Sequence, residues 1–190
     1  MGHSQADKAA THERIIRIAA RLFREDGLDG LSVANIMKAA ELTHGGFYKH
    51  FESRDQLVSE ALAFALQQGR QPRGDPDSNK PKASLESVLK NYLSEAHRDE
   101  LGTACAVGAL VSDVARANED AKDLYTAQVK KNLDSLEYLI ASEDENGRMK
   151  AMVAYSAMIG AVGLSRAVSD EKLSGELLKL VRKYLVTEFG

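Results

Sequence analysis

Residues 43–51 read Thr-His-Gly-Gly-Phe-Tyr-Lys-His-Phe, and this stretch decides how the rest of the chain is interpreted. Thr43 predicts the N-cap of a short helix. Two adjacent glycines in its first turn cost roughly 1 kcal/mol each relative to alanine, and close approach to another surface would compensate. Phe47 and Phe51 suit a buried core, whereas the three polar residues between them suit phosphate oxygens. On spacing and chemistry alone, an ordinary helical hairpin with an exposed Tyr-Lys-His is the alternative.

A second short helix precedes this stretch. After the break at Gly27–Gly30, Ser32 can cap a helix whose apolar residues follow the i, i+3, i+4, i+7 spacing of one helical face. These apolar residues are Val33, Ile36, Met37 and Ala40. About three residues separate the two short helices, which is the geometry of a DNA-reading helix-turn-helix near residues 32–51.

The flanking segments also predict helices. Residues 11–27 alternate apolar and arginine positions with a period near 3.6 residues, which predicts an amphipathic helix with a basic stripe. We interpret the stripe as a solvated face supported by ion pairs, with phosphate contact as the alternative. Ser53 followed by Gln56 matches a capping box, so another helix is expected to begin there.

The rest of the chain is predicted to be helical as well. Residues 68–82 gather all three prolines with glycine, aspartate and asparagine, which predicts a linker or loop. Helical patterns then run from about residue 85 to residue 188, and no segment reads as a strand. We therefore expect an all-α fold of about nine helices, with an N-terminal three-helix DNA-binding part and a larger helical part.

Charge is distributed unevenly along the chain. The net charge of -3 argues against a protein that coats nucleic acid indiscriminately, because such binding needs dense lysine and arginine. Residues 1–54 carry eight Lys and Arg against seven Asp and Glu, whereas residues 55–190 carry 17 against 21. The small positive excess lies where the helix-turn-helix is expected.

Several functional classes find no support in the sequence. Cys105 is the only cysteine, so neither an intrachain disulfide nor a thiolate zinc framework can form. The five histidines lack zinc-binding spacing, and no catalytic motif occurs. We expect no catalytic residue, no metal and no cofactor. A polar amino terminus and the absence of a membrane-length apolar run predict a cytoplasmic protein without a membrane partner.

Residues 11–62 resemble the amino-terminal region of the tetracycline-repressor (TetR) family of transcription regulators. The shared features are Leu22-Phe23 on an amphipathic helix, Gly27, the segment Ser32 to Ile36, and a Phe-Tyr-x-x-Phe core followed by Ser53-Arg54-Asp55-Gln56-Leu57. The resemblance implies that DNA is contacted by Ser32, Thr43, His44, Gly45, Gly46, Tyr48, Lys49, His50 and Arg54.

Two positions depart from the family pattern. Glu41 lies in the turn where the family usually has glycine, at a position that commonly requires positive φ. A non-glycine residue there costs ~1 to 2 kcal/mol, and the added negative charge close to DNA opposes binding. Arg54 replaces the common lysine, keeping the positive charge on a planar fork, and is the weaker contact.

The same resemblance implies a three-part organisation. A DNA-binding domain is expected at residues 1–54, a connecting helix and Pro/Gly-rich loop at 55–82, and an effector-binding and dimerisation domain at 83–190.

The last two helices are expected to form a homodimer. Gly160 and Gly163 permit close helix approach beside one apolar stripe, and a second stripe follows. The expected interface residues are Tyr155, Met158, Ile159, Val162, Leu173, Leu177, Val181 and Tyr184. Buried core within one chain is the alternative for either stripe.

Cys105 is a candidate effector or sensing residue. The segment Gly102 to Leu110 resembles the sixth-helix region of a TetR subgroup that includes regulators responding to reactive electrophiles through cysteine. Cys105 is expected near a helix start, where amide dipoles favour the thiolate. A small buried packing residue is the alternative.

Aromatic residues offer further effector contacts. Tyr92 and Tyr125, together with His97 and Tyr138, combine a polar tip with an apolar body and suit a pocket lining. Half-buried core is the alternative for each.

The predicted function is that of a dimeric repressor. Two recognition helices ~34 to 36 Å apart would read a palindromic double-stranded operator. A small-molecule effector would release the protein by binding the DNA-incompetent arrangement more tightly. A redox or electrophile trigger at Cys105 is the alternative, and a helical enzyme is a distant one.

Overall fold

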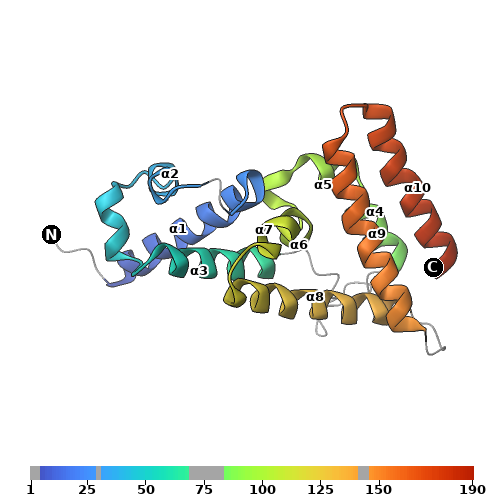
Figure 1. The fold of residues 1–190 in the computed structure, drawn as a ribbon, viewed down its shortest axis with the longest axis horizontal. Coiled ribbons are helices and arrows are strands. Elements are labelled where there is room, and N and C mark those ends of the chain that lie inside the picture. The colour runs from blue at the N-terminus through green and yellow to red at the C-terminus, as the bar shows by residue number, and fades with distance from the viewer. Residues whose placement is uncertain (1–4, 29–30, 69–83, 141–145) are drawn as a thin grey trace. The chain divides into compact units, whose positions relative to one another are not determined.

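The computed structural model describes residues 5–28, 31–68, 84–140 and 146–190, and every regular element in these ranges is a helix (Figure 1). The expectation of an all-α fold is confirmed, since no strand occurs in the described ranges. Apart from Gln68, the expected loop at residues 68–82 lies outside them. Among the helices described, none is both long and apolar enough to cross a membrane.

The chain divides into two compact units. The first comprises residues 1–69 and 101–126, and the second comprises residues 70–100 and 127–190. The first unit thus includes a segment from the middle of the chain in addition to the amino-terminal helices. The functional division at residues 54 and 82 stays a prediction.

The first unit is built around α1 and α3. Its elements are α1 (Gln5–Asp26), α2 (Val33–Ala39), the 3-10 helix η1 (His44–Lys49), α3 (Arg54–Gln67), the 3-10 helix η2 (Leu101–Thr103), α6 (Ala106–Ala109), α7 (Val111–Ala115) and the start of α8 (Glu119–Ile140). α1 and α3 lie side by side (Figure 1). Ile15 and Phe23 of α1 and Leu57 and Leu62 of α3 are fully buried, each stabilising the unit by roughly 1.5–3 kcal/mol.

The starts of α2 and α3 are specified locally. The Ser32 hydroxyl accepts a hydrogen bond from the Asn35 amide at 3.2 Å, and the Ser53 hydroxyl accepts one from the Gln56 amide at 3.1 Å. The Gln56 side chain accepts from the Glu52 amide at 2.7 Å. Both expected serine caps are confirmed, because they depend only on neighbouring residues.

The end of α1 is tied to a distant part of the same unit. Gly27 has φ +81°, which favours glycine, and its amide donates to the Phe23 carbonyl at 2.9 Å. The next amide, that of Leu28, donates to Asp113 Oδ1 at 3.2 Å. A side chain on α7 thereby holds the chain where α1 stops.

The second unit contains the C-terminal hairpin. Its elements are α4 (Leu85–Tyr92), α5 (Glu95–Asp99), the remainder of α8, α9 (Gly147–Ala167) and α10 (Glu171–Phe189). α9 and α10 pack together in opposite directions (Figure 1). Asp170 starts α10 by accepting from the amides of Lys172 and Leu173 at 2.9 and 3.1 Å.

The described ranges hold ten α-helical and two 3-10 segments, more than the about nine helices expected. The apolar stripe that begins at Leu85 is interrupted, because the Ser94 hydroxyl accepts from the His97 amide at 3.2 Å and starts α5. Within the helical patterns expected from residue 85 onward, the stretch at about residues 103–117 is divided among η2, α6 and α7. Apolar periodicity predicted the helical segments but not these breaks.

Candidate nucleic-acid interface

The turn that leads into η1 has the backbone expected from the sequence. Glu41 has φ 57°, the one positive φ of a non-glycine residue in the described ranges. The amide of Glu41 donates to the Lys38 carbonyl and that of Leu42 to the Met37 carbonyl, both at 2.9 Å. The left-handed residue thus closes α2 and directs the chain into η1.

The expected reading helix is a 3-10 helix. Thr43 stands at its N-cap position, but its side chain caps no amide. The Gly46 amide, which a cap at Thr43 would bind, donates instead to the Thr43 carbonyl at 2.9 Å. The expectation of a threonine side-chain cap is therefore wrong, and the hydroxyl stays available on the surface.

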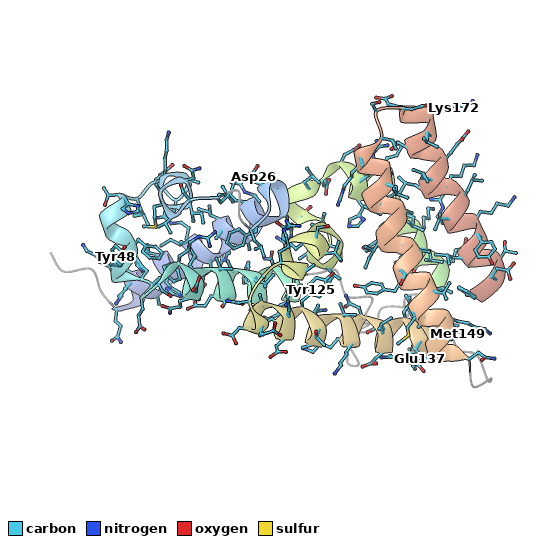
Figure 2. The ribbon with its side chains drawn as sticks, in the orientation of Figure 1. Asp26, Tyr48, Tyr125, Glu137, Met149 and Lys172 are labelled. Carbon is cyan, nitrogen blue, oxygen red and sulfur yellow. The ribbon has the colours of Figure 1, made fainter. Side chains whose placement is uncertain are left out.

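The residues of η1 separate into buried and exposed groups. Phe47 and Phe51 are each 2% exposed and their rings stack at 5.5 Å. Tyr48 is 72% exposed and projects outward from this unit (Figure 2). The exposed residues among the expected DNA contacts are Ser32, Thr43, His44, Gly45, Tyr48, Lys49 and Arg54.

The two glycines of η1 have different surroundings. A methyl group placed on Gly45 would meet no atom within 4 Å, so the protein's own packing does not require glycine there. Gly46 is half-buried, and a methyl group on it would lie 3.6 Å from the Met37 side chain, in ordinary contact. Packing within the described residues therefore gives no reason for glycine at position 45.

His50 is held differently from its two neighbours. It is half-buried, and its Nδ1 is enclosed with no hydrogen-bond partner in the described part of the chain. Burial lowers the pKa of His50, and the positive charges of His12, Lys8 and Lys49 act in the same direction. A phosphate contact from His50 cannot use this enclosed nitrogen.

Arg54 binds within its own unit. Its Nη2 donates to the Leu28 carbonyl at 3.0 Å, which joins the start of α3 to the chain beyond α1. No local pattern indicates this contact, because Leu28 is 26 positions away along the chain. The guanidinium therefore positions the helix-turn-helix whether or not it also meets phosphate.

A polar cluster behind η1 was not expected from the sequence. His12 Nε2 lies 2.7 Å from Glu60 Oε2, and Gln56 Nε2 donates to Glu60 Oε1 at 2.8 Å. The His12 ring stacks on Phe51 at 4.5 Å. Through these contacts α1 and α3 are joined to Phe51, the buried residue that follows η1.

The basic stripe of α1 lies on the surface. Arg14, Arg17 and Arg21 are exposed, and Arg17 Nη2 donates to Glu13 Oε2 at 2.9 Å. The expected solvated face with an ion pair four residues apart is present at these positions, whereas Arg24, the fourth arginine of the expected stripe, is buried. Such an exposed pair contributes little stability, about 0.3–0.5 kcal/mol.

Arg24 is buried, and none of the described carboxylates pairs with it. Its Nη2 donates to the Ala65 carbonyl at 2.8 Å, and its Nη1 donates to the Ala20 and Gly102 carbonyls at 3.2 Å. Burial lowers the pKa of Arg24, while Cys105 acts in the opposite direction. One side chain thus joins α1, α3 and η2.

Cys105 and Tyr125, both expected effector contacts, belong to this first unit. Cys105 is half-buried at the N-cap position of α6. The Tyr125 hydroxyl donates to the Val107 carbonyl at 2.8 Å. Burial, and secondly Cys105, raise the pKa of Tyr125 to about 12, so its hydroxyl stays neutral and serves as a donor.

Tyr92, the third expected effector contact, belongs to the second unit. It is half-buried, its ring lies 4.5 Å from that of His97, and His97 Nδ1 donates to the Tyr92 carbonyl at 2.7 Å. Tyr138 is 67% exposed and lines no interior. An effector role for Tyr92 stays a prediction.

The expected dimer face of α9 needs correction. Tyr155, Met158 and Val162 are 7%, 2% and 3% exposed, because they pack into the core of their own unit, and Ile159 is half-buried. The alternative of a buried intrachain stripe holds for the first three. The opposite face carries the exposed apolar side chains Met149, Met152, Val153 and Leu164.

The expected residues of α10 are more accessible. Leu173 is 43% and Tyr184 is 61% exposed, while Leu177 and Val181 are half-buried. Leu180, which belongs to the same expected apolar stripe, is 58% exposed. Its position, three residues after Leu177 and four before Tyr184, places it on the same helical face.

A family model described as "Bacterial regulatory proteins, tetR family" matches residues 15–61. Similar curated proteins include the HTH-type transcriptional regulator AcrR of Shigella flexneri, 40% identical over 50 residues, which cover 26% of this chain and 23% of that protein. The Transposon Tn10 TetC protein of Escherichia coli is 29% identical over 92 residues, covering 48% of this chain and 47% of TetC. The chain thus spans less than half the length of these relatives.

Solved structures extend the likeness of fold to nearly the whole chain. A TetR transcriptional regulator from Chloroflexus aurantiacus has a TM-score of 0.77 at 22% identity, covering 96% of this chain and 97% of that one. The reduced form of Escherichia coli NemR has a TM-score of 0.74 at 15% identity, covering 95% and 97%. At these identities the comparison shows the shared fold.

Proposed function

This chain belongs to the tetR family of bacterial regulatory proteins, and from that premise we propose that it is a dimeric repressor released from a palindromic operator by a small-molecule effector. Regulators in this family act by binding rather than by catalytic turnover. Its expected partners are double-stranded operator DNA, a second copy of the chain and the effector. Because its proposed partner is operator DNA, we expect the protein to act in the cytoplasm.

The exposed face of η1 carries the proposal. It combines a glycine whose methyl position is open, at Gly45, with the exposed Thr43, Tyr48 and Lys49. Immediately behind them, the buried Phe47 and Phe51 fix the helix to the core. A polar face without protruding side chains at its start suits close approach to a DNA groove.

Each exposed residue has a role in this proposal. Thr43 and His44 reach base edges or backbone, while Tyr48 and Lys49 contact phosphate oxygens beside the groove. Ser32, at the start of α2, adds a hydroxyl contact. Gly46, His50 and Arg54 are secondary, because packing or hydrogen bonds within the chain already occupy part of each.

Dimerisation is proposed through the exposed apolar residues of α9 and α10. Leu164 on α9 and Leu173, Leu180 and Tyr184 on α10 form this surface, together with Met149, Met152 and Val153. Methyl groups on Gly160 or Gly163 would meet nothing within 4 Å, so a partner helix can approach closely there. Exposed apolar area of this kind favours burial against a second copy.

Binding measurements with matched substitutions test the DNA proposal. Operator sequences are first selected from random duplex DNA, and affinity is then measured at several salt concentrations. Lys49→Ala should weaken binding about tenfold and reduce the salt slope by about one, since one phosphate contact is lost. Tyr48→Ala should also weaken binding about tenfold.

Two substitutions elsewhere serve as controls for that experiment. Tyr138 is 67% exposed, close to the 72% of Tyr48, and Lys130 is exposed on α8. Tyr138→Ala and Lys130→Ala should leave affinity and salt slope unchanged. Binding that ignores the substitutions in η1, or that falls equally with the controls, would contradict the proposal.

A second candidate is release of DNA by electrophiles at Cys105. The observation that favours it is the buried Arg24, whose charge interacts with Cys105 and whose hydrogen bonds reach Ala65 at the end of α3. N-ethylmaleimide would form a carbon–sulfur bond at Cys105, opening the alkene and placing a proton on the adjacent carbon. Alkylation should release operator from the natural protein but not from Cys105→Ser, and equal release from both would reject this candidate.

A further inference from the structure

The polar cluster behind η1 forms a continuous path of contacts from α1 through α3 to the segment that follows η1. His12 Nε2 lies 2.7 Å from Glu60 Oε2, and Gln56 Nε2 donates to Glu60 Oε1 at 2.8 Å. Gln56 Oε1 in turn accepts a hydrogen bond from the Glu52 amide at 2.7 Å. The two oxygens of one carboxylate are therefore engaged separately, one by a residue of α1 and the other by a residue of α3.

This path ends on two consecutive residues. On one branch, the His12 ring stacks on Phe51 at 4.5 Å, and Phe51 stacks on Phe47 of η1 at 5.5 Å. On the other branch, the path ends at the backbone amide of Glu52. Glu60 thus acts on the side chain of one residue and on the backbone of the next.

The carboxylate of Glu60 determines how both of its partners are oriented. An ionised carboxylate only accepts hydrogen bonds, so His12 Nε2 and Gln56 Nε2 are the donors. Hydrogen bonds to a charged acceptor are shorter and stronger than those between neutral groups. The side chains of His12 and Glu60 are 27% and 34% exposed, so most of the pair is shielded from water. An apolar residue in place of Glu60 would release both donors.

The proposed phosphate contacts lie within one turn of the residue that this path holds. Tyr48 and Lys49 are exposed, three and two positions before Phe51. Phe51 is 2% exposed, so its ring fixes the backbone from the inner side. Because a binding residue must be held within about 0.5 Å of its productive position, a displaced Phe51 ring would impair both contacts.

We propose that Glu60 is a positioning residue for DNA binding, which acts through His12 and Gln56 to set the placement of the exposed face of η1. This inference rests on the proposed binding of operator DNA. Glu60 is half-buried behind η1, and its effect is transmitted by its neighbours rather than by contact with DNA.

The negative charge of Glu60 distinguishes positioning from simple electrostatics. A carboxylate in a DNA-binding unit repels phosphate, so its replacement by a neutral residue would raise operator affinity if charge alone mattered. Loss of positioning has the opposite sign and lowers the affinity. Low ionic strength makes the comparison strictest, because electrostatic repulsion is then least screened.

Operator titration of the full chain at low salt tests the proposal. Glu60→Leu should weaken binding about tenfold, because hydrogen bonds to a charged group are lost from the path. Glu60→Gln keeps a carbonyl acceptor and should stay within about threefold of the natural protein. Glu13→Leu is the matched control, since it removes the same charge from the exposed position next to His12 and should not weaken binding.

A second variant interrupts the same path at another point. Gln56→Leu removes the link between Glu60 and the Glu52 amide, should weaken binding by a similar factor, and serves if Glu60→Leu does not fold. Circular dichroism establishes which variants are folded. Unchanged or higher affinity in the folded variants, or an equal loss in Glu13→Leu, would overturn the proposal.

Nuclear magnetic resonance tests the placement without DNA. The Glu52 amide proton should move upfield in Glu60→Leu, because its hydrogen bond to Gln56 is no longer held in place. The His12 ring protons, which lie against Phe51, should lose their ring-current shift. Both signals should stay unchanged in Glu13→Leu. A folded Glu60→Leu protein with the natural shifts at both residues would contradict the proposed positioning.

The two measurements separate failure of this inference from failure of the proposed function. If the natural protein binds no operator, the repressor proposal fails and the inference fails with it. If the natural protein binds an operator and folded Glu60→Leu binds it as tightly, the inference fails alone. Weaker binding by Glu60→Leu, together with shifted Glu52 and His12 signals, supports both.

Discussion

At the scale of single residues, Glu41 combines two unfavourable features. Its φ of 57° places a side chain in the left-handed region, which costs ~1 to 2 kcal/mol. Its carboxylate is exposed in the turn that leads into η1, beside the proposed DNA surface. Backbone strain and charge can be separated by two different substitutions.

Glu41→Gly should stabilise the protein by about 1 kcal/mol, because glycine adopts positive φ without a steric cost. For a chain of this length, that corresponds to a rise in Tm of about 2–4 °C. Glu41→Gln should leave Tm nearly unchanged but raise operator affinity about two- to fivefold at low salt. Thermal unfolding and operator titration check the pair, and equal Tm values for the glycine variant and the natural protein would contradict the account.

His50 should give stability a dependence on pH. Its pKa is lowered from the ordinary 6.5, first by burial and then by nearby positive charge, so the folded protein holds the neutral ring. Between 6.5 and the lowered pKa, the unfolded chain binds more protons than the folded one. The stabilising contribution is thus complete above pH 6.5 and is lost as the pH falls through the lowered pKa.

His50→Gln removes this contribution to the pH dependence. Urea unfolding of the natural protein and of the variant, measured at pH 7.5 and pH 5.5, should show the smaller loss of stability in the variant. Parallel losses in the two proteins would show that His50 does not titrate in this way.

At the scale of elements, Arg24 fixes the packing of the first unit. Its three carbonyl partners lie on α1, at the end of α3 and on η2. A buried carbonyl that loses its donor incurs a desolvation cost of about 1–3 kcal/mol. The arrangement of these elements therefore depends on one guanidinium more than on any surface charge.

Arg24→Met should destabilise the protein by about 2–3 kcal/mol, measured by urea unfolding. Arg17→Met is the matched control, since Arg17 lies on the same helix but is exposed and pairs with the exposed Glu13. Its effect should stay below ~0.5 kcal/mol. Similar effects of the two substitutions would argue against a structural role for Arg24.

Structural features that depend on neighbouring residues could be predicted from the sequence, whereas contacts between distant residues could not. The caps at Ser32 and Ser53 depend on a few neighbouring residues and were expected, whereas the positive φ at Glu41 was expected from the resemblance to the TetR family. The contacts of Arg24 and Arg54 join residues tens of positions apart, so no local pattern indicates them. These contacts are ordinary hydrogen bonds, and they could not be predicted because their partners lie far apart in the chain.

The helix α9 shows a different difficulty. It is apolar on two faces, one with Tyr155 and Met158 and the other with Met152 and Leu164. Periodicity identifies such faces but does not indicate which one packs against the chain's own helices. The face that was expected to form the dimer interface packs inward instead, although the helix itself was expected.

At the scale of the whole molecule, the exposed apolar residues of α9 and α10 form the proposed dimer surface. The described residues leave Leu164, Leu180 and Tyr184 each more than half exposed. In a dimer these side chains would leave water together, and two DNA-reading helices would be held at a fixed separation. Cooperative reading of a palindrome depends on that separation.

Leu180→Glu should weaken dimerisation about 100-fold, because an unpaired carboxylate would be buried in the interface. Sedimentation velocity over a range of concentrations measures the effect, with circular dichroism to confirm that the helices persist. Lys179→Glu changes charge at the adjacent, exposed position and should leave the dimer intact. A Leu180→Glu protein that sediments as the natural dimer would remove this face from the interface.

The first compact unit draws together residues 1–69 and 101–126, and this has a consequence for synthesis. During translation the amino-terminal helices leave the ribosome before Gly102 and Asp113, the residues that accept hydrogen bonds from Arg24 and Leu28. At ~5 to 20 residues per second, the later segment follows roughly 3 to 12 s behind. We expect a nascent chain to bind DNA tightly only after that interval. An unfinished polypeptide would therefore not compete with the complete protein for the operator.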